Sequence, residues 1–112
     1  MASSIFNNIL QLFIDMCSTV NTVTGANGQD TIDYIKIGKI VVFNAIMYYG
    51  TQTDRVYDIP SAKAIVCGCR NTSTGAIGQV WMNGTTISTY GGGVSWQSGQ
   101  YIMFGGVYIA RS

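Results

Sequence analysis

The sequence predicts a mainly β protein in which an N-terminal helical neck precedes a small antiparallel β-sandwich head. The period of the apolar residues changes once, at 25–30. Upstream, steps of four and three residues give a heptad seam, formed by Ile5, Ile9, Leu12, Met16, Thr19 and Val23. Downstream, apolar residues recur with the period of β-strands, interrupted by glycine-containing turns. We therefore expect a neck and oligomerisation segment at 1–26 and a head domain at 27–112.

The apolar arc of the predicted helix is wider than a two-stranded coiled coil needs, because Phe6, Phe13 and Val20 lie beside the heptad seam. An arc of this width fits a helix that touches two partners at once, as in a homotrimer. The residues expected to hold that trimer are Ile5, Ile9, Leu12, Met16 and Val23. The alternative is a single amphipathic helix that covers an ordinary sheet.

Composition indicates association with other protein surfaces. The 112 residues suffice for one domain with an adequate core. Charged residues make up 10% of the chain and the formal net charge is +1, so there is no basic footprint for nucleic acid or anionic lipid. The apolar N-terminal stretch is too short and too often interrupted by polar residues for membrane insertion or for a signal peptide. A surface with so few charges is typical of a protein that hides part of it in an oligomer.

The chain contains no histidine and no glutamate, which excludes the common imidazole and glutamate catalysts. Only Asp54 and Asp58 are close in sequence without adjoining a strand core, and solvated loop aspartates explain them best. Cys67 and Cys69 lie two apart and would share one face of a strand, whereas Cys17 falls in the helix. Without further ligands nearby, buried small apolar side chains are a better interpretation than a metal site. We expect no enzyme activity, cofactor or metal.

Three two-residue turns predict hairpins in the head. Gly38-Lys39 would pair Ile37 with Ile40, Asn83-Gly84 would set Trp81 opposite Thr86, and Gly105-Gly106 would set Phe104 opposite Val107. A further strand is expected at 62–69, after Asp58-Ile-Pro60. In the second hairpin one face carries Trp81 and Tyr90, and the other carries the core candidates Val80, Met82 and Ile87. About seven short strands of this kind predict a compact, jelly-roll-like sandwich.

Several of these segments together resemble the C-terminal head domains of bacteriophage tail-fibre and baseplate receptor-binding proteins. The resemblance rests on the runs at 34–43, 58–60, 80–87 and 98–102, and it covers residues 34–112. It implies a homotrimeric β-sandwich that binds saccharides of the bacterial surface and works beside other phage tail or baseplate proteins. It also implies a location in the virion, in the phage tail, after assembly in the host cytoplasm.

Residue chemistry indicates where a saccharide would bind. Sugars present flat C–H faces and a fringe of hydroxyl groups, so a groove for them needs aromatic rings beside polar or charged groups. The residues that supply these groups are Trp81, Tyr90, Trp96, Asp54 and Arg55. An alternative is that Trp81 and Tyr90 fill a subunit interface, where aromatic residues are enriched.

We therefore expect a non-enzymatic receptor-binding module of a phage tail that recognises host saccharide as a homotrimer. The principal alternative is a purely structural trimer, such as a fibre tip or capsid decoration protein, that binds no sugar. A lectin-like module from outside viruses is a third possibility.

Overall fold

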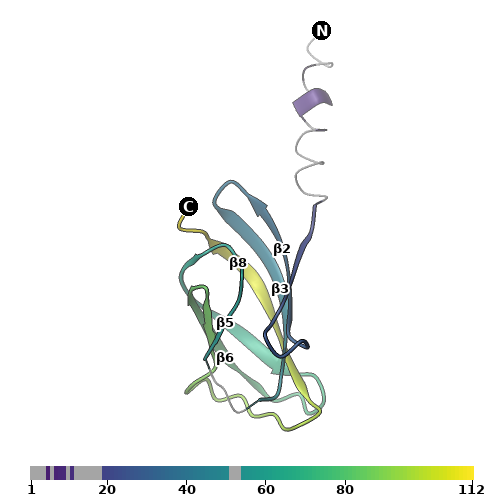
Figure 1. Ribbon diagram of the computed structural model, residues 1–112, viewed down its shortest axis with the longest axis vertical. Coiled ribbons are helices and arrows are strands. Elements are labelled where there is room, and N and C mark those ends of the chain that lie inside the picture. Colours follow the sequence, from purple (N-terminus) through teal and green to yellow (C-terminus); the bar gives the residue numbers. More distant parts are fainter. Residues whose placement is uncertain (1–4, 6, 10, 12–18, 51–53) are drawn as a thin grey trace.

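The structure is a computed structural model, and it describes residues 5, 7–9, 11, 19–50 and 54–112 (Figure 1). Eight strands form the head, and all their pairings are antiparallel. They are β1 (Asn21–Thr24), β2 (Thr31–Ile37), β3 (Ile40–Tyr48), β4 (Asp54–Val56), β5 (Ala62–Asn71), β6 (Ile77–Gly84), β7 (Thr86–Ser88) and β8 (Tyr101–Ile109). The prediction of a mainly β head built from antiparallel strands is therefore confirmed.

The strands are hydrogen-bonded in one continuous sheet, in the order β1-β2-β3-β8-β5-β6-β7-β4. A sandwich of two separate sheets was expected. Instead, β8 joins the two halves, because it pairs with β3 along its length and with the end of β5 at Cys69–Phe104. Figure 1 shows the sheet curling so that β2, β3 and β8 lie on one side and β5 and β6 on the other. The inner face of this curl holds the core.

The core follows from strict alternation along the long strands. Every second residue of β3 is buried, and the same holds for the ends of β8 and for much of β5 and β6. The expected core residues Val80, Met82 and Ile87 are at most 1% exposed. Cys67 and Cys69 are also buried on this inner face, in agreement with their interpretation as small apolar side chains.

The first predicted hairpin is confirmed residue by residue. Ile37 pairs with Ile40 and Ile35 pairs with Val42, across a turn in which Gly38 has a φ of +59°. A positive φ is readily adopted by glycine, which explains why this position closes the turn.

The second hairpin forms with its turn one residue later than predicted. Asn83 pairs with Thr86 and Trp81 pairs with Ser88, so Gly84 and Thr85 are the central residues. A type I′ turn centred on Asn83-Gly84 would need a positive φ at both residues, but only Gly84 has one, at +65°. Glycine at the first central position is typical of a type II′ turn. Each partner shifts by two positions, so the predicted faces of the strands are preserved.

The third predicted hairpin is wrong. Residues 101–109 form the single strand β8, with no turn at Gly105-Gly106. A Cβ atom at Gly105 would lie 2.7 Å from the carbonyl oxygen of Phe43. The glycine therefore permits close approach of β8 to β3, which is the other common reason for glycine in a strand.

The prediction of a helix as far as Val23 is also wrong at its C-terminal end. Ile5, 7–9 and Gln11 are helical, but Asn21–Thr24 is the edge strand β1, where Val23 pairs with Ile32 and packs against the core. Residues 19–24 are rich in β-branched side chains, which favour a strand. Ile5 and Ile9 are each 63% exposed. Leu12 and Met16, the other expected trimer contacts, lie outside the described residues.

Candidate functional site

A buried ion pair closes the curled sheet. Asp30 precedes β2 and is 1% exposed, and its Oδ2 lies 2.6 Å from Nη1 of Arg55 on β4. Because β2 and β4 lie near opposite ends of the strand order, this contact joins the two margins of the sheet. Arg55 also donates a hydrogen bond to the carbonyl oxygen of Tyr48, 2.8 Å away, which ties the same point to β3.

Three further donors converge on the Asp30 carboxylate. The Tyr57 hydroxyl donates to Oδ2 at 2.6 Å, while the Tyr48 amide and the Asn27 side chain donate to Oδ1 at 2.8 and 2.9 Å. Burial alone would raise the pKa of Asp30, but these hydrogen bonds and the one from Arg55 outweigh it and lower the pKa below 3.8. Burial and the neighbouring carboxylate raise the pKa of Tyr57. Asp30 is therefore ionised and Tyr57 protonated at neutral pH.

A hollow of about 420 Å³ lies beside this ion pair. We call it the clasp cleft. It is lined by Ala26, Asn27, Gln29, Asp30, Tyr49, Gly50, Asp54, Arg55, Val56 and Tyr57. Its wall combines an aromatic ring that is 46% exposed, Tyr49, with the side-chain amides of Asn27 and Gln29 and with charged groups. This combination of an apolar ring and fixed polar groups is typical of a small-ligand site.

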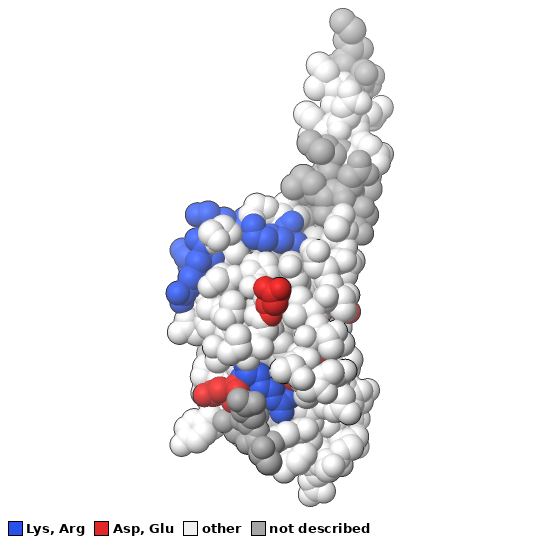
Figure 2. Space-filling model, in the orientation of Figure 1, with Lys and Arg blue, Asp and Glu red and all other residues white. Residues whose placement is uncertain are grey.

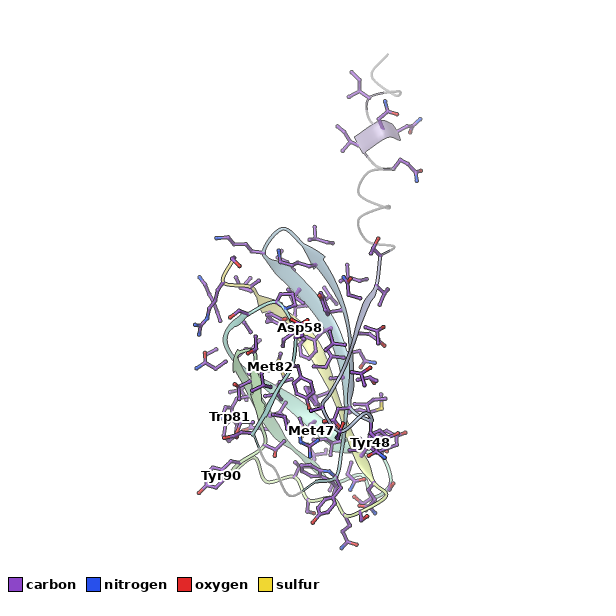
Figure 3. The ribbon with its side chains drawn as sticks, viewed as in Figure 1. Met47, Tyr48, Asp58, Trp81, Met82 and Tyr90 are labelled. Atoms are coloured by element: carbon purple, nitrogen blue, oxygen red, sulfur yellow. The ribbon has the colours of Figure 1, made fainter. Side chains whose placement is uncertain are left out.

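A second set of candidate residues lies on the outer surface of β6, β7 and β4. Trp81 pairs with Ser88, and Ser88 pairs with Asp54, so the three share one row across three strands. The Ser88 hydroxyl donates to Asp54 Oδ1 at 2.5 Å and holds the carboxylate in this row. Tyr90 follows β7 and is 73% exposed. Figure 3 shows Trp81 and Tyr90 projecting from the same side of the head. We call this set the outer row.

Trp96 lies elsewhere. Its ring meets Tyr49 edge-on, with centroids 6.3 Å apart and an interplanar angle of 86°, and it packs against the core. The indole Nε1 is buried and has no hydrogen-bond partner among the described residues. Trp96 therefore lies between Tyr49 and the core and helps to hold the Tyr49 ring in the wall of the clasp cleft.

The five predicted ligand-binding residues are thus divided between two neighbouring places. Trp81, Tyr90 and Asp54 belong to the outer row, whereas Arg55 lines the clasp cleft and Trp96 stands behind it. Asp54 belongs to both, because it also lines the cleft.

Sequence reasoning missed the other cleft residues that have suitable side chains, namely Tyr49, Asn27 and Gln29. Two turn-like sequences, 25–30 and 49–54, were the available signals. They indicate loops, but nothing local says that two loops separated by a long strand pair meet.

The described residues hold no group of three or more potential metal ligands. Cys67 and Cys69 are buried, and burial raises the pKa of both thiols, which makes them poor nucleophiles. Within the described part of the chain, no helix is long and apolar enough to cross a membrane. The groups that line the clasp cleft, an aromatic ring, side-chain amides and charged groups, are suited to binding a ligand.

No protein-family model, curated protein sequence or solved structure matches this chain.

Proposed function

We propose that the chain is a non-enzymatic receptor-binding module of a bacteriophage tail, which binds host cell-surface saccharide as a homotrimer. The observation that carries this proposal is the clasp cleft, a concave site with one exposed aromatic ring and several planar polar groups. The resemblance of the head sequence to phage receptor-binding domains supports the same class of ligand.

The chemistry of the cleft fits a sugar ring. The Tyr49 ring offers an apolar surface for C–H groups, and the exposed Gln29 amide offers a donor and an acceptor for hydroxyl groups. The Asn27 side chain instead shapes the cleft, because its amide is bonded to Asp30 and to the amides of its own loop. Asp54 adds an acceptor. Figure 2 shows a head surface that is mostly uncharged on this side, which favours a hydroxyl-rich ligand over a polyanion. The outer row, with Trp81 and Tyr90, would extend the contact to a second sugar unit beyond Asp54.

The position of the cleft also supports the proposal. The N-terminal segment joins β1 at Asn21, and the cleft lies past the opposite end of that strand, at 26–30. A module held to a larger particle through its N-terminal segment would therefore present the cleft outward. Three such sites on one trimer would raise a modest single-site affinity through effective concentration.

The test is binding of the purified full chain to an array of bacterial surface glycans. Gln29→Ala should weaken binding about tenfold, the effect of losing a contact worth about 1.4 kcal/mol. Tyr49→Leu should do the same, and it keeps an apolar side chain against Trp96. Gln97→Ala is the matched control, because Gln97 is exposed and does not line the cleft.

Absence of glycan binding by the wild-type trimer would favour the structural alternative, a fibre tip or capsid decoration protein. Binding that survives both cleft substitutions would contradict the cleft as the site.

A further inference from the structure

The outer surface of β2, β3 and β8 carries a continuous group of aliphatic side chains. They are Ile35, Ile37, Ile40, Val42, Val107 and Ile109, which we call the aliphatic face. The four on β3 and β8 are each between 44% and 52% exposed. Asp33 is the one charged residue among the outward positions of these three strands, and it accepts a hydrogen bond from the Thr22 hydroxyl. Aliphatic groups on this scale mark an interaction surface.

Strand register brings these side chains into contact range. Ile40 pairs with both Ile37 and Ile109, which gives one row across three strands. Val42 pairs with both Ile35 and Val107, which gives a second row beside the first. Directly paired residues in antiparallel strands have Cβ atoms about 5 Å apart. The aliphatic face is therefore one patch and not a set of isolated apolar residues.

The N-terminal segment adjoins this patch. A hollow of about 220 Å³ is lined by Val20 together with Ile35 and Val42, and Val20 itself is 56% exposed. Further along the segment, Ile5 and Ile9 are exposed as well. The apolar surface of the head thus includes Val20, and exposed apolar side chains occur again at Ile5 and Ile9.

We infer that the aliphatic face is the surface through which copies of this chain pack together. Where copies meet around a shared axis, each brings the same charges, so the surface that they share must hold few charges of one sign. Asp33 is the only charged residue at the outward positions of β2, β3 and β8. These outward positions hold no basic residue, which argues against an anionic lipid surface as the partner of the aliphatic face. This inference rests on the proposed function, from which it takes the number of copies in the assembly, three.

The area that a specific interface needs also favours another copy of this chain as the partner. A specific interface buries roughly 800 Å² on each partner, which is more than these six partly exposed side chains provide. Val20 lies next to the patch, and the exposed Ile5 and Ile9 would supply additional area if copies associate with their N-terminal segments on the same side. A partner that met the head alone would leave Ile5 and Ile9 exposed.

The experiment is sedimentation of the full chain over a range of micromolar concentrations. Wild type should sediment as a trimer. Val42→Glu should raise the apparent dissociation constant at least a hundredfold, because it places like charges in every copy of the interface. Ile77→Glu is the matched control, an exposed aliphatic on β6 outside the patch, and it should leave the trimer unchanged.

A milder variant keeps the test valid if Val42→Glu fails to fold. Val107→Thr preserves the β-branched shape that suits a strand and replaces one methyl group with a hydroxyl group, so it should weaken association about tenfold with the far-UV circular dichroism spectrum retained. A monomeric wild type, or trimers of both patch variants as stable as wild type, would overturn the inference. Glycan binding is measured separately, so an assembled chain that binds no glycan would contradict the proposed function and leave this inference standing.

Discussion

The two outer surfaces of the curled sheet share one backbone geometry but differ in chemistry. The aliphatic face on β2, β3 and β8 presents isoleucine and valine in two rows. The outer row on β6, β7 and β4 presents Trp81 and Asp54, with Tyr90 beside them, and the buried Ser88 holds the Asp54 carboxylate in place. Inward residues on both sides are similar, since both contribute to one core. The inward positions therefore define the fold, and the outward positions distinguish a surface suited to association from one suited to a polar ligand.

The Asp30–Arg55 ion pair keeps these two surfaces in a fixed relation, so its loss should have the largest effect. Asp30→Asn removes one charge and leaves the guanidinium of Arg55, which is 10% exposed in its side chain, beside a neutral group. Breaking a buried pair in this way costs about 3–5 kcal/mol. In denaturant unfolding, the free energy of unfolding should decrease by this amount. Asp33→Asn is a suitable control because Asp33 is an exposed aspartate on β2, the strand that follows Asp30, and it should change stability by less than about 0.5 kcal/mol.

The same carboxylate should make stability depend on pH. Its pKa is lowered in the folded state, so its contribution is fully present above the ordinary value of 3.8 and is lost as the pH falls through the lowered value. Wild type should therefore lose melting temperature progressively below about pH 5, and Asp30→Asn should show a shallower decrease. The chain has no histidine and no glutamate, which leaves few other groups to titrate in this range. Parallel profiles for the two proteins would show that the ion pair contributes little.

A smaller effect is expected at the turn that sets the register of the outer row. Gly84 has a φ of +65°, and a Cβ atom there would meet only Ser61 Oγ at 3.7 Å, so the space is open and the backbone conformation alone disfavours a side chain. Gly84→Val should cost about 1–3 kcal/mol through that strain.

Gly68→Ala is the matched control for that turn. Gly68 lies on β5 without a positive φ and with no atom near the added methyl group, so this change should be neutral or slightly stabilising. If both substitutions lowered the free energy of unfolding equally, backbone strain at the turn would not explain the requirement for Gly84.

These positions show which features the sequence could predict. The Gly38-Lys39 hairpin depends on a turn and on the alternation beside it, which are both local, and its pairs were predicted correctly. Gly105-Gly106 has an equally turn-like sequence, but its role depends on the Phe43 carbonyl oxygen, which lies far away in the chain. Local pattern cannot distinguish a glycine that turns from one that admits a neighbouring strand.

The candidate site illustrates the same limit. Alternation predicted that Trp81 lies on the face opposite Val80, Met82 and Ile87, since that needs only the parity of a hairpin. The clasp cleft required that Asp30 and Arg55 meet, and these residues lie near opposite ends of the strand order. No spacing in the sequence encodes that contact. Arg55 was therefore expected to orient a ligand, whereas its guanidinium binds Asp30 and the Tyr48 carbonyl oxygen.

The smallest effect on stability, and the sharpest separation of the two surfaces, is expected at Tyr90. Its side chain is 73% exposed, so Tyr90→Ala should change the free energy of unfolding by less than about 0.5 kcal/mol. Sedimentation should still give the wild-type assembly, because Tyr90 lies outside the aliphatic face. Binding to bacterial cells should nevertheless decrease, since an exposed ring offers stacking area to a sugar. Val107→Thr should show the reverse pattern, with weaker assembly and an unaltered single-site affinity. If Tyr90→Ala instead dissociates the protein, the outer row is a subunit contact, and the functional contrast between the two surfaces is lost.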